Sequence, residues 1–470
     1  MKFRHEPYSP AGSSPGGGAG SSRRSVRALV AALLVAGLAP SLAGCGGSGG
    51  GDATGEAFGQ TSTYAMSVGR AEHAVATLGN GDLLIAGGTG GSGVPLASTE
   101  VFDASLVGSS TSPLVSAGPM AFARARHTTT FLGTGNVVAI GGAATSAIEE
   151  FAPNAATPAL GAWTTAPVAA LATPRSRHAA VRLLDGRVLV VGGEDVFGVA
   201  LAACELFVSA GVATLPAAPL ATARRNHTAT LLPDGRVLVV GGNDVLGQPL
   251  DGAELYTPGT NTWAPATNTL AVARTLHAAH FLDGGNPSPA DDRVLIVGGA
   301  GAGGAGVAAA ELFDPATGAF GPGGVLEGPA VFDVASAVLA NGEVGIAGGF
   351  TSGGASASTA PTREVLVYRL AGAGGVGAQD VPERRGAARA GALASAGPAG
   401  SDLVVVGGYD EDGVPRREVF VLAVDDEATA LADTLSDEEA LAFGVFATGF
   451  HVLDDGFLGF GDVELWIDQD

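Results

Sequence analysis

Apolar residues along the chain fall into short runs that recur about every fifty residues. Residues 175–193 read R-S-R-H-A-A-V-R-L-L-D-G-R-V-L-V-V-G-G, and residues 224–242 repeat this phrase closely. Unbroken Val-rich runs are typical of strands that are buried on both faces. The Asp-Gly between two such runs predicts a tight hairpin. Looser copies occupy residues 70–88, 124–142 and 274–299, so the chain is expected to be a repeat protein.

Each repeat continues past its double glycine into a third and a fourth strand. In four copies a Glu stands twelve residues after the second glycine and opens a third apolar run. A turn and a fourth segment follow, which Trp163 or Trp263 opens in two copies. A single four-stranded sheet of this kind has two apolar faces and cannot cover both. Stacking the sheets radially covers them, which predicts an all-β propeller of four-stranded blades.

An Arg-x-x-His motif opens the first strand of five copies, and a double glycine ends the second strand. The residues are Arg70, His73, Gly87 and Gly88; Arg124, His127, Gly141 and Gly142; Arg175, His178, Gly192 and Gly193; Arg224, His227, Gly241 and Gly242; and Arg274, His277, Gly298 and Gly299. Buried charges need partners, so we expect each Arg to pair with the Glu of a nearby third strand. Each His is expected to satisfy backbone groups between blades. No His-x-His or His-x-x-x-His pair supports zinc, so we expect these residues to be structural and to hold no metal.

These marks resemble the Kelch-repeat family, within the galactose-oxidase-like β-propellers. The double glycine recurs at Gly348-Gly349 and Gly407-Gly408, which makes seven copies. The acidic residue of the third strand is assigned to Glu100, Glu150, Glu205, Glu254, Glu311, Glu364 and Glu418. Copies six and seven depart from the pattern, because Val331 and Val334 replace the Arg and His in copy six. The resemblance implies a Kelch-type propeller over residues 58–470.

Two features favour eight blades over the six or seven common in this family. Residues 451–461 look like a degenerate eighth hairpin, with residues 463–467 as its third strand. Residues 60–69 resemble the fourth-strand segments elsewhere, so the N-terminal strand is expected to pair with the last blade. The prediction is seven clear repeats and a degenerate eighth, closed by that strand.

The N-terminal region reads as an export signal. Residues 1–44 hold a disordered extension, then basic residues, then the short apolar run 28–38. Leu42-Ala43-Gly44-Cys45 resembles the bacterial lipobox, which implies that Cys45 is acylated and begins the mature chain. Residues 45–57 would then be the lipidated Cys and a Gly-rich tether. We expect a lipid anchor in the bacterial cell envelope, at the outer rather than the inner membrane.

The net charge and the cysteine content limit the classes of partner that we expect. Residues 45–470 carry 19 basic and 45 acidic residues, a net charge of −26, which disfavours nucleic acid. Cys204 has no second mature cysteine to pair with except Cys45 and is interpreted as a small buried hydrophobe. We expect a monomer that meets the membrane only through its anchor.

Function is assigned to one rim of the propeller. In Kelch-type propellers the loops after the double glycines share a face with the start of the first strands. The polar or aromatic residues in these loops are the ligand-binding candidates: Glu194, Asp195, Asn243, Asp244, Asp251, Phe350, Tyr409 and Asp410. We expect a binding scaffold for protein, peptide or glycan, with no cofactor and no catalytic residue. The alternative is a carbohydrate-active enzyme, mutarotase-like or galactose-oxidase-like, whose titratable groups would converge on the central channel. A copper-radical site would need two Tyr, two His and a Tyr-Cys crosslink, and the sequence gives it little support.

Overall fold

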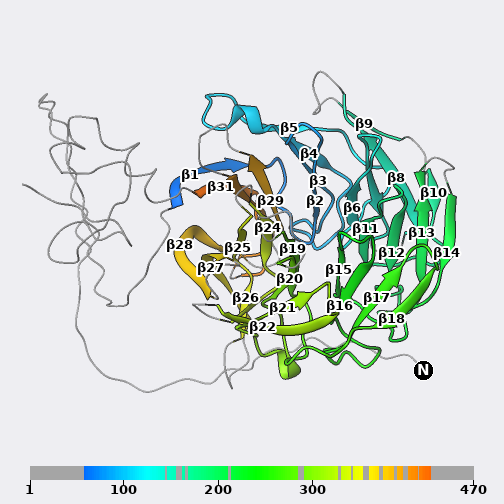
Figure 1. Cartoon of the computed structure of the whole chain (residues 1–470). Coiled ribbons are helices and arrows are strands. Elements are labelled where there is room, and N and C mark those ends of the chain that lie inside the picture. Colours follow the sequence, from blue (N-terminus) through cyan, green and yellow to red (C-terminus); the bar gives the residue numbers. More distant parts are fainter. Residues whose placement is uncertain are drawn as a thin grey trace, which may run out of the picture. The chain divides into compact units, whose positions relative to one another are not determined.

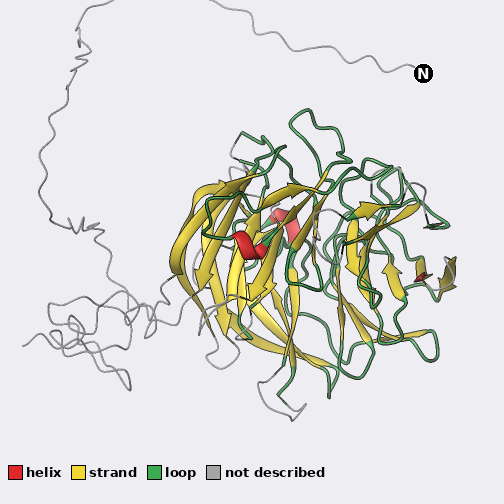
Figure 2. Ribbon diagram, turned by 90° about the horizontal axis from the view of Figure 1, so that it is seen from above, coloured by secondary structure: helices red, strands yellow, loops and turns green. Residues whose placement is uncertain are grey.

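The structure is a computed structural model that describes residues 58–424, apart from residues 143–144, 155–160, 165–167, 210–212, 284–290, 327–329, 340–341, 353–358, 370–373, 386–388, 395–400 and 411. The predicted signal, the lipidated Cys45 and the eighth hairpin all lie outside the described residues. Within those residues the regular structure is strand, with two short 3₁₀ turns, η1 (Ala104–Leu106) and η4 (Ala302–Gly304) (Figure 2). No described helix is long and apolar enough to cross a membrane.

Seven antiparallel sheets follow one another along the chain, as the repeats predict. Blade 1 contains β2 (Ala74–Thr77), β3 (Leu83–Ala86), β4 (Thr99–Phe102) and β5 (Leu114–Ser116). Blade 2 contains β6 (Thr128–Phe131), β7 (Val137–Ile140), β8 (Ala147–Ala152), β9 (Ala162–Trp163) and β10 (Ala169–Ala170). Blade 3 contains β11 (Ala179–Arg182), β12 (Val188–Val191), β13 (Cys204–Val208) and β14 (Ala213–Ala217). Blade 4 contains β15 (Thr228–Leu231), β16 (Val237–Val240), β17 (Ala253–Thr257) and β18 (Thr262–Pro265).

The last three blades keep the same order with small additions. Blade 5 contains β19 (Ala278–Leu282), β20 (Arg293–Val297), β21 (Ala309–Asp314) and β22 (Ala319–Val325). Blade 6 contains β24 (Ala335–Val338), β25 (Val344–Ala347), β27 (Thr359–Arg369) and β28 (Gly374–Arg385), with β23 (Val331–Phe332) and β26 (Phe350–Ser352) beside it. Blade 7 contains β29 (Arg389–Ala394), β30 (Ser401–Val406), β31 (Glu418–Val424) and the N-terminal strand β1 (Phe58–Ala65).

The ring closes at seven blades. β1 pairs with β31, from Phe58 opposite Val424 to Ala65 opposite Glu418, so the predicted closure by the N-terminal strand is confirmed. It completes blade 7, however, and the prediction of an eighth blade in the ring is wrong. The inner strands β2, β6, β11, β15, β19, β24 and β29 each contact the next, and β29 contacts β2 (Figure 1). No gap is left in this ring for another sheet.

Apolar packing between the blades accounts for the closure. Seven buried clusters each combine residues of two adjacent blades, one for every interface around the ring. The second strands are buried throughout, as in β12 and β16, because both of their faces contact a neighbouring sheet. Radial stacking therefore provides the cover that a single sheet lacks.

The double glycine lets adjacent blades approach closely. The second glycine donates its N–H to the carbonyl at the motif Arg position of the next blade: Gly142 to Arg175 at 2.8 Å, Gly193 to Arg224 at 2.9 Å, and Gly408 to Arg70 at 2.9 Å. A Cβ on Gly192 would lie 2.6 Å from the Arg224 carbonyl oxygen. Both glycines also have positive φ, so the pair is required by conformation as well as by space.

Candidate functional site

The five motif arginines are buried structural cations, each paired with a carboxylate of its own blade. Arg70 pairs with Glu100 at 3.0 Å, Arg175 with Glu205 at 2.6 Å, Arg224 with Glu254 at 2.8 Å and Arg274 with Glu311 at 2.6 Å, and Arg124 pairs with Glu149. Each guanidinium also donates to backbone carbonyls around the double glycine, as Arg175 does to Gly192 and Ala203. The predicted pairing of Arg with a third-strand Glu is therefore present in these five blades.

Blade 2 corrects one assignment. The acidic residue that pairs with Arg124 is Glu149, whereas the sequence pattern pointed to Glu150. Neighbouring residues of β8 face opposite sides of the sheet, and Glu150 instead accepts a hydrogen bond from Asn136 at 2.5 Å. The loop after this double glycine is shorter than in the other copies, so counting residues from the glycines misplaces the pair.

The motif histidines lie between blades. His178 Nε2 lies 3.0 Å from the Thr128 hydroxyl, and His277 Nε2 lies 3.0 Å from the Thr228 hydroxyl, each in the preceding blade. The inter-blade position is as expected, although the partner in these two cases is a hydroxyl rather than a backbone group. Burial, and then the charges of Arg175 and Arg124, lower the pKa of His178 to about 3. Burial, and then Arg274 and Arg224, lower the pKa of His277 to about 3.

These low pKa values predict acid destabilisation. An unfolded imidazole has a pKa of about 6.5, so between pH 6.5 and about 3 the unfolded chain binds protons that the folded chain does not. The stabilising contribution is complete above pH 6.5 and is lost as the pH falls toward 3. Each such histidine should lower the free energy of unfolding by up to about 1.4 kcal/mol per pH unit. Urea unfolding at pH 7.5, 6.0 and 5.0 measures this, and His277→Gln should flatten the dependence. An unfolding free energy that is constant from pH 7.5 to 5.0 would contradict the assignment.

Between each motif Arg and His the chain makes a sharp corner at the mouth of the central channel. The residue two after the Arg position has positive φ between 53° and 57° in six blades: Glu72, Arg126, Arg177, Asn226, Leu276 and Asp333. From blade 2 to blade 6, each corner N–H donates to the carbonyl of the previous corner, from Arg126 to Glu72 at 2.9 Å through to Asp333 to Leu276 at 2.8 Å. A left-handed conformation is unfavourable for non-glycine residues. Side chains kept at such positions are candidates for function.

The corner residues surround a cavity of about 410 Å³. All six line it, together with four motif histidines and residues at the N-terminal ends of inner strands, such as Thr128 and Ser336. This volume lies in the range of about 300–1,000 Å³ that small-molecule sites occupy. The wall is chemically uneven, because the corners of blades 1 to 3 are charged and Leu276 of blade 5 is apolar.

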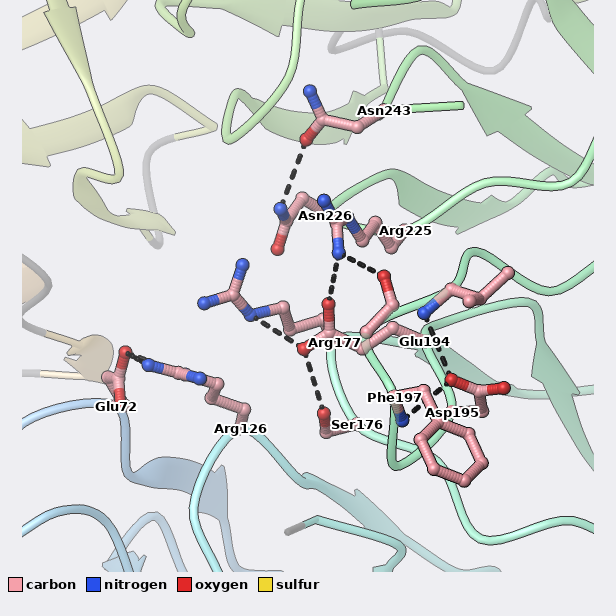
Figure 3. Close-up of polar contacts among 12 residues, drawn as sticks. Glu72, Arg126, Ser176, Arg177, Glu194, Asp195, Phe197, Arg225, Asn226 and Asn243 are labelled. Carbon is pink, nitrogen blue, oxygen red and sulfur yellow. Dashed lines mark hydrogen bonds and ion pairs between the residues drawn. The ribbon is translucent and has the colours of Figure 1, made fainter. Parts of the chain in front are cut away.

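Arg177 presents unoccupied donors to this cavity. Its Nε lies 3.1 Å from Glu194 Oε1, and the two outer nitrogens of its guanidinium carry no contact among the described residues (Figure 3). Burial and then the nearby charge of Arg126 lower the pKa of Arg177, while Glu194 opposes this. The side chain is 29% exposed, so these donors can be reached. An anion between Arg126 and Arg177 would relieve their repulsion and accept the free hydrogen bonds.

Arg126, unlike Arg177, forms a close ion pair with a carboxylate that also lines the cavity. Its Nη2 lies 2.7 Å from Glu72 Oε1, and Thr89 donates to the other Glu72 oxygen at 3.0 Å. Burial opposes the charge of Arg126, but the hydrogen bond to Glu72 and its attraction outweigh this and raise the pKa of Arg126. Glu72 is thus occupied on both oxygens, whereas Arg126 remains 41% exposed beside Arg177.

A second circle of residues, one place after each double glycine, supports the corners. Glu194 accepts hydrogen bonds from Ser176 and from Arg225 as well as pairing with Arg177 (Figure 3). Asn243 accepts from Asn226 at 3.1 Å and from Thr275 at 2.6 Å. Through these contacts the second circle sets where the corner side chains point.

None of the eight sequence candidates lines the cavity. Glu194, Asn243, Phe350 and Tyr409 belong to the second circle, where Phe350 stacks on Phe332 and burial raises the pKa of Tyr409. Asp195, Asp244 and Asp410 cap their own loops, each accepting from the N–H groups two and four residues later. Asp251 is exposed, and its backbone carbonyl accepts from Leu270.

The corner residues escaped the sequence analysis because they stood between two motif residues and were treated as spacers. A signal was present nonetheless. Within a frame fixed by Arg and His, the third position changes from Glu to Arg, Arg, Asn and Leu through the five copies. A position that varies inside an otherwise repeated phrase is where the blades differ chemically.

The copper-radical site does not fit the described residues. The Tyr256 hydroxyl donates to Asn261 Oδ1 at 2.8 Å, and the Tyr368 hydroxyl donates to the Gly323 carbonyl at 2.9 Å. Cys204 shares an apolar cluster with Tyr256 between blades 3 and 4, where burial raises its pKa to about 11. The described part of the chain holds no group of three His, Cys, Asp or Glu placed to share a metal ion.

Comparison with known proteins agrees with this architecture. The family model for the Kelch motif matches residues 224–269, which lie in blade 4 and its approach. No curated protein matches the sequence. Among solved structures, a fungal alcohol oxidase in complex with copper is similar, with a TM-score of 0.58 and 15% identity over 78% of this chain and 76% of its own. The structure of YjhT has a TM-score of 0.45 and 12% identity over 76% of this chain and 96% of its own. At 15% identity the likeness to the oxidase concerns the fold alone.

Three findings agree: seven double-glycine repeats, seven antiparallel sheets closed into a ring, and the match to the Kelch motif. The chain is a seven-bladed β-propeller that carries a Kelch motif at residues 224–269.

Proposed function

We propose that this propeller is an exported, lipid-anchored binding protein that recognises a carboxylate-bearing ligand at the mouth of its channel. The observation that carries the proposal is the Arg177 guanidinium, which keeps two donors free beside Arg126 in a cavity of small-molecule size. A planar guanidinium fork matches the two oxygens of a carboxylate. The ligand presents this group on a peptide or on an acidic glycan.

The rest of the protein's charge supports a specific site over general attraction. With a net charge of −22 at pH 7, the chain as a whole repels anions. Arg126 and Arg177 are each paired with a carboxylate, so the attraction comes from the free donors of Arg177 rather than from a general positive field. A ligand with a single carboxylate can reach these donors, whereas a polyanion such as nucleic acid meets an unfavourable surface.

The experiment is an array of acidic peptides and acidic glycans, followed by calorimetric titration of the best ligand. Arg177→Ala should weaken binding about 10- to 100-fold, because a hydrogen bond to a charged group contributes about 1.5–3 kcal/mol. Arg177→Lys should recover only part of this, since lysine lacks the fork. Arg187→Ala, on a hairpin turn at the opposite rim, is the matched control and should bind normally. Unchanged affinity in Arg177→Ala would refute the proposal.

A carbohydrate-active enzyme is the second candidate, because the channel does gather titratable residues. Glu72 and Asp333 line the same cavity as the two arginines, which is the convergence that an enzyme requires. NMR of a bound acidic sugar distinguishes the two candidates. Conversion of the sugar that Asp333→Asn abolishes would favour the enzyme, and binding without conversion favours the scaffold.

A further inference from the structure

The motif histidines of blades 3, 4 and 5 occupy the same position against the preceding blade. A Cβ added to the first glycine of that blade would lie 2.8 or 2.9 Å from the ring Cε1 in each case, for His178, His227 and His277. The three rings therefore meet the neighbouring sheet in the same way. A difference in what their nitrogens contact must come from the side chain that the preceding blade places beside the ring.

The residue after the motif His of the preceding blade supplies that side chain. Thr128 and Thr228 stand there in blades 2 and 4, and their hydroxyls lie 3.0 Å from Nε2 of His178 and His277. Blade 3 has Ala179 at this place. All three residues begin an inner strand and pair with the last residue of the second strand, so their positions are equivalent. Between blades 3 and 4 a methyl thus replaces the hydroxyl.

His227 is consequently a buried imidazole without a hydrogen bond. The residue is 7% exposed, and neither ring nitrogen has a hydrogen-bond partner among the described residues. Burial, and then the charge of Arg224, lower the pKa of His227 well below 6.5, while the nearby Val191 carbonyl, outside hydrogen-bond geometry, opposes this. The ring is neutral at pH 7, so it offers one donor and one acceptor. Buried polar groups in native proteins are nearly always hydrogen-bonded, so this exception requires an explanation.

The channel cavity provides one. His227 lines the cavity and follows Asn226, whose N–H donates to the Arg177 carbonyl at 3.0 Å. Asn226 and Arg177 are neighbours at the mouth of the channel (Figure 3). The strand β11, which begins at Ala179, is partly exposed along its length, so the protein does not seal this place. The unpaired imidazole and the free donors of Arg177 therefore belong to one wall of the cavity, in blades 3 and 4.

The corresponding place in blade 1 is different. Ala74 stands there, beside blade 2 and its His127, but Ala74 is buried, with 7% exposed. The corner residue of blade 1 is Glu72, whose two oxygens already contact Arg126 and Thr89. The interface between blades 1 and 2 therefore lacks the combination of an open place and free cationic donors.

We propose that His227 is a further binding residue of the channel site and that the ligand is a hydroxycarboxylate. The carboxylate meets the free donors of Arg177. The hydroxyl takes, beside Ala179, the place that a threonine hydroxyl fills in blades 2 and 4. A hydroxyl suits a neutral imidazole because it both donates and accepts hydrogen bonds. The inference rests on the proposed function, because it names the class of ligand for the same site.

An NMR titration, which suits weak ligands, compares butyrate with both enantiomers of 2-hydroxybutyrate and of 3-hydroxybutyrate. The wild-type chain should bind the best hydroxy acid about 3- to 10-fold more tightly than butyrate, as one hydrogen bond between neutral groups allows. Arg177→Ala should weaken butyrate and this hydroxy acid alike. Equal affinities for butyrate and all the hydroxy acids would overturn the inference and leave the carboxylate site intact. Binding of none of these acids would contradict the proposed function, and this inference with it.

Ala179→Thr tests the role of His227 directly. The substitution gives blade 3 the residue of blades 2 and 4, so the variant should fold, and the new hydroxyl should pair with His227. The urea midpoint should rise, and the preference for the hydroxy acid over butyrate should fall to about one.

Ala278→Thr is the matched control for this variant. It adds the same side chain at the equivalent place of blade 5, where the next blade carries Val334 instead of a motif histidine. The preference for the hydroxy acid should persist in this variant. Retention of the preference in Ala179→Thr, or an equal loss in both variants, would overturn the assignment of His227.

Discussion

Arg175→Ala should lower the free energy of unfolding by about 3–5 kcal/mol, the cost of breaking a buried ion pair from one side. The substitution leaves Glu205, 7% exposed, charged and without the guanidinium that it meets at 2.6 Å. It also removes the donor to the Gly192 and Ala203 carbonyls. Urea unfolding, followed by tryptophan fluorescence, measures the loss.

Arg187→Ala is the matched control in the same blade. Arg187 also pairs with a carboxylate at 2.6 Å, but its partner Asp185 lies on the exposed hairpin turn, 47% exposed. Surface pairs contribute about 0–1 kcal/mol, so this variant should unfold close to wild type. Similar effects of the two substitutions would show that the motif arginines are not the buried frame of the blades.

Gly192→Ala should be the second most damaging single change, through the interface between blades 3 and 4. The new methyl would lie 2.6 Å from the Arg224 carbonyl oxygen and 2.9 Å from His227 Cε1. The carbonyl oxygen belongs to the backbone of blade 4 and cannot give way without shifting that blade. Overpacking of about 1–3 kcal/mol is expected, in addition to about 1 kcal/mol for a left-handed alanine.

Gly186→Ala is the control that distinguishes the steric clash at Gly192 from the cost of a positive φ. Gly186 has φ of +86° at the hairpin turn, and nothing lies within 4 Å of its Cβ position. Gly192 has φ of +54°, which alanine tolerates no worse. The unfolding free energy of Gly192→Ala should therefore be lower than that of Gly186→Ala. The reverse order would mean that conformation, and not the approach of the next blade, explains the double glycine.

Local chemistry made most of the fold predictable. Asp185-Gly186 predicted a hairpin, the Val-rich runs predicted buried strands, and repetition at a regular spacing predicted radial stacking. Closure by β1 was also predictable, since residues 60–69 resemble other fourth strands. Each of these signals is a pattern within one blade or between equivalent positions.

The number of blades could not be predicted from such local patterns. An apolar hairpin pattern such as that of residues 451–461 indicates that a pair of strands could form. It does not indicate whether the ring has room for another blade. The edge of β31 can pair with only one outer strand, and β1 takes that place. Closure is a property of the whole ring.

The loops chosen from the sequence border the corners that line the cavity, but none of the eight chosen residues lines it. Loop residues such as Glu194 looked available in the sequence, yet the structure binds its carboxylate to Arg177, Arg225 and Ser176. Arg177 itself looked like a spacer within a motif. Its place in the cavity wall comes with a left-handed corner, which the repeat pattern does not reveal.

The central claim is that the repeated residues hold the ring while the variable corner residues bind the ligand. The most direct measurement is a crystal structure of residues 45–470 with the carboxylate ligand selected on the array. The account predicts the ligand's carboxylate in the channel mouth, within hydrogen-bond distance of Arg177 and beside Arg126. A ligand bound on the outer loops or at the opposite rim, with the corner residues uninvolved, would contradict it.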